Sequence, residues 1–135
     1  MKILFISTKF YPDVISGGQI SSYHIAKSLT KNNDVYVLTL YKGKKIIKEK
    51  LEGLTIIRIP YKKRIKILSN LDLMWLFITK LSLKYIKKIK PDIIHLINFE
   101  PIFYKFFFIK FFFPKIKIVT TVNGPLFGCF TQSAI

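Results

Sequence analysis

The chain opens with MKILFISTKFYPDVISGGQI (residues 1–20), in which a short apolar run leads into a loop and then into paired glycines. Residues 3–7 form a continuous apolar stretch, which is typical of a strand buried on both faces of a parallel sheet. Helical spacing of the residues that follow Gly18 predicts a helix over residues 18–31. A strand, a glycine-containing loop and a helix together make the first half of a βαβ unit.

The alternation of strands and helices continues along the chain. Four further segments are rich in β-branched or aromatic residues and are predicted as strands: residues 34–40, 54–59, 92–97 and 117–122. Apolar residues from Leu71 to Ile89 recur at three- and four-residue steps with lysines on the opposite side, which predicts a helix that ends before Pro91. Residues 101–113 are predicted as an aromatic helix, and the lysine-rich residues 41–53 as a surface loop.

This alternation predicts an α/β domain in which right-handed βαβ crossovers build a parallel sheet. In such a sheet the loops at the carboxyl ends of the strands share one edge, and ligands bind there. Four segments should therefore line one crevice: residues 8–18, 40–43, 98–101 and 123–127. A chain of 135 residues has the size of one domain, so we expect residues 1–135 to fold as a single unit.

The formal net charge of +16 favours partners that carry phosphate, such as nucleotides, nucleic acid or the anionic headgroups of a membrane. The lysines recur along nearly the whole chain, so an equally good interpretation is that they merely solvate the surface. No motif that reads nucleic acid is present, and we expect no specific nucleic-acid partner. The sequence also lacks G-x-G-x-x-G and G-x-x-x-x-G-K-[ST], which argues against those two nucleotide-binding classes.

Cys129 is the single cysteine, and together with His24 and His95 it supplies too few ligands for a zinc site. We therefore expect no metal and a reducing, cytoplasmic location. The apolar run at the amino terminus is shorter than that of a signal peptide, and lysines interrupt the nearest candidate for a membrane span, residues 102–114. A spanning helix is not expected.

Polar residues near the predicted carboxyl edge are the candidates for binding. Gly17 and Gly18 open the first helix, where backbone N–H groups favour an anion, although a structural turn explains the glycines as well. His95 lies near the end of a strand, where it either contacts an acceptor or packs in the core with its nitrogens hydrogen-bonded. Asn98 follows as a second candidate contact, and Glu100 either bonds an acceptor hydroxyl or favours the start of the next helix.

Read in order, several segments resemble the opening of the family 4 glycosyltransferases of the GT-B type. These segments are a tyrosine-proline loop, a double glycine, an alanine-leucine helix, a valine-x-valine strand, a further strand and a threonine-rich strand with a glycine after it: Lys9-Phe10-Tyr11-Pro12, Gly17-Gly18, Ile25-Ala26-Lys27-Ser28-Leu29, Asp34-Val35-Tyr36-Val37, Pro91-Asp92-Ile93-Ile94-His95 and Val119-Thr120-Thr121-Val122-Asn123-Gly124. Each segment is common, but the ordered set is specific and covers nearly the whole chain.

The resemblance implies an enzyme of two Rossmann-like domains that face each other across a cleft, need no metal and retain the configuration of the transferred sugar. We expect this chain to be the amino-terminal, acceptor-side domain, a doubly wound parallel sheet with strand order 3-2-1-4-5. The family's donor-binding domain, with its basic residue and paired glutamates, is not found in residues 1–135. The isolated chain is therefore expected to be inactive and to work with a carboxyl-terminal lobe or a split partner.

The resemblance also carries residues into a predicted binding site: Tyr11, Gly17, Gly18, His95, Asn98, Asn123 and Gly124. In the family the double-glycine loop lies against the phosphates of a nucleotide-sugar donor, and the sugar acceptor is a glycan or a lipid-linked saccharide. No further cofactor is implied. Asn123 stands where the family usually has histidine, and because an amide holds no proton near neutral pH we assign no certain catalytic residue.

A different function also stays open, that of a non-catalytic module that binds an anionic membrane surface or a partner protein. Residues 103–113 are apolar nearly all round. They form either a fully buried helix or a helix whose aromatic side meets a lipid interface while its lysines reach the headgroups. The second arrangement would place the protein peripherally at the inner face of the membrane.

Overall fold

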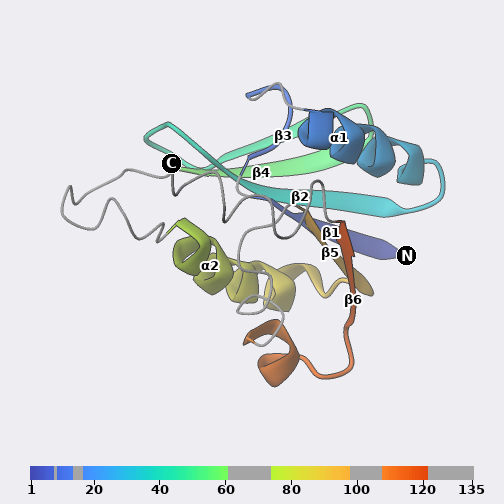
Figure 1. The fold of residues 1–135 in the computed structure, drawn as a ribbon, viewed down its shortest axis with the longest axis vertical. Coiled ribbons are helices and arrows are strands. Elements are labelled where there is room, and N and C mark those ends of the chain that lie inside the picture. Colours follow the sequence, from blue (N-terminus) through green and yellow to red (C-terminus); the bar gives the residue numbers. More distant parts are fainter. Residues whose placement is uncertain (8, 14–16, 61–73, 98–107, 122–135) are drawn as a thin grey trace, which may run out of the picture.

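The computed structural model describes residues 1–7, 9–13, 17–60, 74–97 and 108–121. Within these ranges one sheet lies between helices on both of its faces (Figure 1). The elements follow one another as β1 (Lys2–Ile6), α1 (Gly17–Leu29), β2 (Asp34–Tyr41), β3 (Ile47–Leu51), β4 (Leu54–Pro60), α2 (Met74–Ile89), β5 (Ile93–Ile97) and β6 (Lys117–Thr121).

The six strands lie in the order β3-β4-β2-β1-β5-β6. β1 pairs in parallel with β2 on one side and with β5 on the other, and β4 and β6 extend the sheet in the same direction. When the parallel strands are numbered among themselves, their order is the predicted 3-2-1-4-5. The prediction of a Rossmann-like α/β domain with a parallel sheet is thus confirmed, and the carboxyl ends of these strands share one edge.

The prediction for residues 41–53 was wrong, because β3 lies within this segment and pairs in antiparallel fashion with β4. A two-residue turn at Glu52 and Gly53 joins the two strands, with φ angles of 47° and 85°. Positive φ at both turn positions gives the chain the twist that a tight hairpin needs. The lysines of β3 hide its alternation, and they also discourage pairing of this edge strand with other chains.

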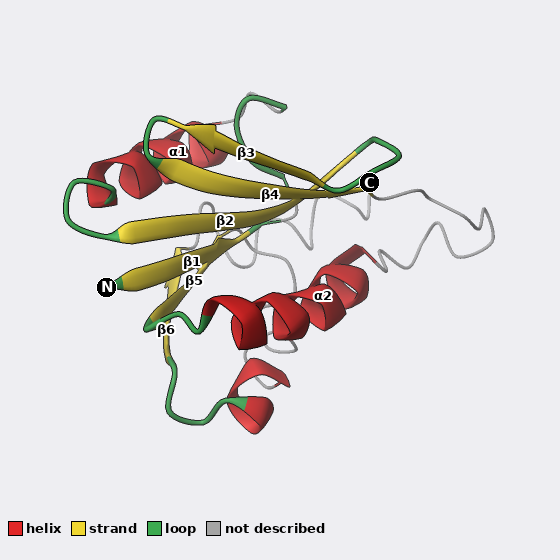
Figure 2. Cartoon of the chain, turned by 180° about the vertical axis from the view of Figure 1, so that it is seen from behind, coloured by secondary structure: helices red, strands yellow, loops and turns green. Residues whose placement is uncertain are grey.

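Apolar side chains form two cores, one between each face of the sheet and the helix that covers it. On one face, Tyr23 and Ala26 of α1 pack with sheet residues such as Phe5. On the other face, Ile78 and Ile86 of α2 pack with the alternate residues of the same strands, which include Leu4 and Leu38. Figure 2 shows α1 and α2 on opposite sides of the sheet. Burial on both faces explains why the central strands are continuous apolar runs.

The helix boundaries agree closely with the sequence pattern. α1 ends at Leu29, slightly before the predicted residue 31, and α2 ends at Ile89 as the pattern indicated. Lys90 adopts a left-handed φ of 53° and Pro91 follows, which terminates α2. Residues 108–112 are helical, within the predicted aromatic helix, while residues 101–107 lie outside the described residues. Among the described helices none is long and apolar enough to cross a membrane.

Candidate functional site

Part of the predicted crevice can be located at the carboxyl edge of the sheet. The structure describes residues 9–13, 17–18 and 40–43 of the segments expected there, and it describes His95 within β5. Residues 98–101 and 123–127 lie outside the described residues, and with them the predicted site residues Asn98, Asn123 and Gly124. Of the predicted site residues, the structure therefore describes Tyr11, Gly17, Gly18 and His95.

The loop that follows β1 is held by aromatic packing. Phe10 is buried in the core on the α1 side. Tyr11 is partly exposed and stacks on Tyr23 of α1, with 4.4 Å between the ring centroids. The Tyr11–Pro12 peptide bond is cis, and the Asp13 N–H donates to the Phe10 carbonyl oxygen at 3.3 Å. One buried ring and one stacked ring thus anchor a loop whose outer residues face solvent.

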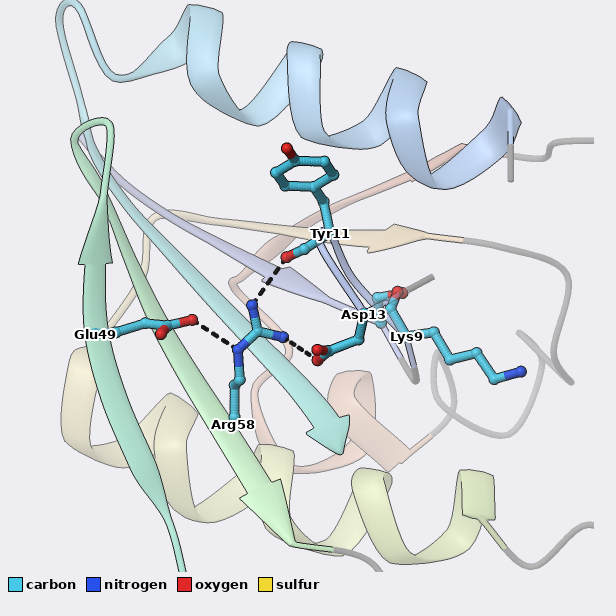
Figure 3. Close-up of polar contacts among 6 residues, drawn as sticks. Lys9, Tyr11, Asp13, Glu49 and Arg58 are labelled. Atoms are coloured by element: carbon cyan, nitrogen blue, oxygen red, sulfur yellow. Dashed lines mark hydrogen bonds and ion pairs between the residues drawn. The ribbon is translucent and has the colours of Figure 1, made fainter. Parts of the chain in front are cut away.

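The buried guanidinium of Arg58 also holds this loop in place. Arg58 of β4 donates from Nη1 to Asp13 Oδ2 and from Nε to Glu49 Oε1, each at 2.6 Å, and from Nη2 to the Tyr11 carbonyl oxygen at 2.9 Å. Figure 3 shows the Arg58 side chain between Glu49 on β3 and Asp13 on the loop. Arg58 is buried, whereas the two carboxylates are about half exposed. We call these three side chains the Arg58 clamp, because they join the loop to the β3–β4 hairpin.

The paired glycines begin α1 at the same edge of the sheet. Beyond its chain neighbours and the backbone of α1, no atom of the described residues lies within 4 Å of a Cβ atom placed on Gly17. The Gly18 carbonyl oxygen accepts a hydrogen bond from Ser22 Oγ at 2.7 Å, one turn further along the helix. The first turn of a helix presents backbone N–H groups without helical partners, and these suit an anion. A methyl group on Gly17 would therefore meet no described neighbour.

His95 packs inside the sheet rather than at the tip of a strand. Its ring lies against Phe5 with 4.5 Å between the centroids, and its Nε2 is 2.6 Å from Thr121 Oγ1 on β6. Burial removes water from the ring and lowers the pKa of His95 below its usual value, because the charged form is the one that loses hydration. These contacts suit the core interpretation, and a contact between His95 and an acceptor stays a prediction.

The Arg58 clamp was not predicted from the sequence, although β4 contains one signal for it. Arg58 is the only charged residue of β4, and strand alternation puts it on the same face as Leu54 and Ile56, which belong to the α1-side core. An arginine in such a position requires charged partners, since a buried charge without them is costly. One of the partners, Glu49, lies on β3, a segment predicted as a loop, and the other, Asp13, lies 45 residues away in the loop after β1.

The described residues contain no group of three or more histidine, cysteine, aspartate or glutamate side chains close enough to hold a metal ion. The carboxylates nearest the loop, Asp13 and Glu49, are bound to Arg58 instead. What the arrangement offers is therefore a fixed loop, partly exposed carboxylates and a helix that begins with two glycines. Such groups position ligands through hydrogen bonds.

Comparisons with known proteins identify the fold. No protein-family model and no curated protein matches the sequence. Among solved structures, the sucrose-phosphate synthase from Thermosynechococcus elongatus matches 98% of this chain with a TM-score of 0.62 and 15% sequence identity. The match covers 35% of the synthase chain, so the present chain spans about a third of that protein's length. At this identity the likeness concerns the fold alone, a Rossmann-like α/β domain that corresponds to about a third of the synthase chain.

Proposed function

We propose that this chain is the acceptor-side domain of a metal-independent, retaining glycosyltransferase of the family 4 type. The enzyme would transfer a sugar from a nucleotide-sugar to a glycan or a lipid-linked acceptor, in the cytoplasm or at the inner face of the membrane. The domain would act together with a donor-binding lobe, either on the same polypeptide or on a partner, and by itself it would not complete a transfer.

One observation carries this proposal: the Tyr11–Pro12 loop and the glycine start of α1 lie at the carboxyl edge of a 3-2-1-4-5 sheet, and Arg58 fixes the loop. Ligands of open parallel sheets bind at this edge. The ordered sequence motifs and the fold of the synthase support the same choice. Gly17 and Gly18 would approach the phosphates of the donor, and Tyr11, His95 and Asn98 would contact the acceptor. Asn123 and Gly124 would lie near the reacting sugar.

Binding to the 135-residue chain tests the proposal without assuming which sugar is transferred. The chain is labelled with ¹⁵N and titrated with UDP, GDP and ADP, and separately with methyl glycosides of the common hexoses. Nucleoside diphosphates should shift the amide resonances of Gly17 and Gly18, and glycosides those of the loop at residues 9–13. Because the chain is strongly basic, inorganic phosphate at physiological ionic strength controls for general attraction of anions to the lysines.

Gly17→Val sharpens this test. The open space at Gly17 accommodates the added side chain, so the fold should persist while the approach of phosphate is blocked. Ser21→Val, at an exposed position one turn along α1, is the matched control. In an enzyme that combines this domain with a donor-binding lobe, Gly17→Val should abolish sugar transfer while Ser21→Val preserves it. Equal transfer by both variants would refute the placement of the donor phosphates.

A second function, binding to an anionic membrane surface without catalysis, is favoured by one observation. Three aromatic residues of the turn at residues 108–112 are exposed: Phe108 (45%), Phe111 (79%) and Phe112 (52%). Lys115 and Lys117 follow them and are also exposed. Exposed aromatic rings beside lysines suit the interface of a membrane that carries negative headgroups.

Co-sedimentation with vesicles tests this second function. Wild-type chain should sediment with vesicles that contain phosphatidylserine and not with vesicles of phosphatidylcholine alone, and salt should weaken the binding. Replacing Phe111 and Phe112 by serine should release the chain. The control is Ile46→Ser, which removes an apolar side chain that is 56% exposed elsewhere on the surface. If the double variant sediments as the wild type does, the exposed phenylalanines of residues 108–112 do not bind the membrane.

A further inference from the structure

A hollow of about 350 Å³ lies over the β3–β4 hairpin, beside the loop that the Arg58 clamp holds. Its walls include Asp13 and Pro12 from the loop, Tyr41 from the end of β2, and Glu49 and Arg58 from the hairpin. Strand alternation places Arg58 on the face of the sheet that α1 covers. The hollow thus occupies the part of that face next to the loop, on the side of the sheet away from β5 and β6.

The polar groups of the hollow are fixed in position and retain bonding capacity. Arg58 occupies one oxygen of each carboxylate, Asp13 Oδ2 and Glu49 Oε1. An ionised carboxylate accepts about four hydrogen bonds over its two oxygens. Since both side chains are nearly half exposed, their remaining acceptor positions face solvent in the hollow. Two rigid acceptors on either side of a guanidinium suit a ligand with several hydroxyl donors.

The remaining walls are apolar, and the charged side chains on this face of the sheet are two acids and one base. Ile47, which is 39% exposed, Leu51 and Pro12 supply aliphatic surface, and Tyr41 supplies a ring. The charged side chains on this face are Asp13, Glu49 and Arg58, since strand alternation directs Lys50, which also lines the hollow, to the opposite face of β3. A hollow in which two carboxylates flank one guanidinium repels a phosphate, and the guanidinium between the carboxylates disfavours a cation. It suits a neutral ligand with hydroxyl groups on its edges and C–H groups on its faces.

We propose that this hollow binds a neutral saccharide unit, whose hydroxyl groups donate to the carboxylates of Asp13 and Glu49 while its C–H face rests on Ile47 and Pro12. Small-molecule sites have volumes from about 300 Å³ upward, so the hollow suits one or two sugar rings. The assignment of this unit as part of the acceptor rests on the proposed function. The site itself rests only on the contacts around the Arg58 clamp.

The proposal is tested by titrating the ¹⁵N-labelled 135-residue chain with methyl glycosides of glucose, galactose, mannose and N-acetylglucosamine, and with maltose. At least one of these should shift the amides of Asp13, of residues 47–51 and of Arg58. Inorganic phosphate should leave those amides in place. Glu49→Gln and Asp13→Asn should each weaken saccharide binding by about tenfold or more, the effect of removing a hydrogen bond to a charged group.

Two further variants make the result decisive. Glu52→Gln removes the same charge from the same hairpin, but Glu52 contacts Tyr23 and Lys27 outside the hollow, so it should bind saccharide as the wild type does. Ile47→Trp places an indole in the hollow and leaves the Arg58 clamp intact, so it should abolish binding even if an acid variant fails to fold. Absence of saccharide shifts at the hairpin, equal affinity in Glu49→Gln and Glu52→Gln, or undiminished affinity in Ile47→Trp would overturn the proposal.

The outcomes also separate this inference from the proposed function. Saccharide binding at the hairpin without any response of Gly17 and Gly18 to nucleoside diphosphates would retain the hollow and remove the transferase. If nucleoside diphosphates shift the amides of Gly17 and Gly18, and saccharides shift only residues 9–11 and His95, the transferase proposal stands and the hollow is not its acceptor site.

Discussion

Removing both carboxylates from the Arg58 clamp should destabilise the chain by more than the two separate changes together. Arg58 is buried, and its charge is balanced by Asp13 on the loop and by Glu49 on β3. While one carboxylate remains, the guanidinium keeps a charged partner and its bond to the Tyr11 carbonyl oxygen. When both are replaced, by Asp13→Asn and Glu49→Gln, a buried positive charge loses all its charged partners.

The exposure of the partners sets the magnitudes. The side chains of Asp13 and Glu49 are 48% and 41% exposed, so water screens each ion pair and each single change should lower the free energy of unfolding by about 1 kcal/mol. A buried charge without a partner costs about 3–5 kcal/mol. The double variant should therefore lose about 3–5 kcal/mol, which leaves a coupling energy of about 1–3 kcal/mol between two side chains that both bind Arg58.

Urea denaturation followed by far-UV circular dichroism measures these free energies for the wild type, both singles and the double variant. Repeating the cycle with Arg58→Met gives the internal control, because without the buried charge neither carboxylate has a charge to balance. In that background both acid changes should have effects near zero, and the coupling should vanish. Additive effects in the wild-type background, or a coupling that persists with methionine at position 58, would show that Arg58 does not hold the loop through its charge.

Other parts of the structure give further expectations. The free energy of unfolding should decline as the pH falls below about 6.5, because burial lowers the pKa of His95 and the unfolded chain therefore binds a proton more readily than the folded chain. In urea titrations His95→Gln should remove this decline, and His24→Gln should not. Gly53→Ala should cost about 1–2 kcal/mol in the same assay, since φ is 85° and the new Cβ would lie 3.0 Å from Thr30 Cβ. Gly17→Ala should leave the melting temperature unchanged or slightly higher, since the new Cβ meets no described residue within 4 Å. The same variant should weaken nucleoside diphosphate binding in the NMR titration, because the methyl group would stand where the phosphate approaches.

The parallel part of the fold could be predicted because its signals are local. Each central strand is a continuous apolar run, each helix has its own periodicity, and short connections between them force the crossovers. β3 could not be predicted in this way. As an edge strand it has one hydrogen-bonded neighbour and an open side, so its lysines and Glu49 do not alternate with apolar residues. Its best signal was the turn at Glu52 and Gly53, where only the glycine is a typical turn residue.

The candidate site was predictable only where the chain itself joins its parts. Tyr11 and Gly17 follow β1 directly, so their position at the carboxyl edge follows from the order of the elements. His95 is different, because Thr121 decides its packing and lies 26 residues away. Arg58 is 45 residues from Asp13, and the pattern of β4 signals that it needs partners without indicating which ones. Long-range pairing of charges has no periodicity in the sequence.

The antiparallel strand and the loop are best understood together. A sheet with only the order 3-2-1-4-5 would place Arg58 on an edge strand, where Asp13 would be its one charged partner among the described residues. β3 covers that edge and brings Glu49 to the guanidinium, so a buried arginine becomes tolerable in β4. Arg58 in turn binds the Tyr11 carbonyl oxygen, which connects the hairpin to the loop at the carboxyl edge. Because the same two carboxylates line the hollow, a change in the hairpin that displaces Glu49 should alter both the position of the loop and the affinity for saccharide.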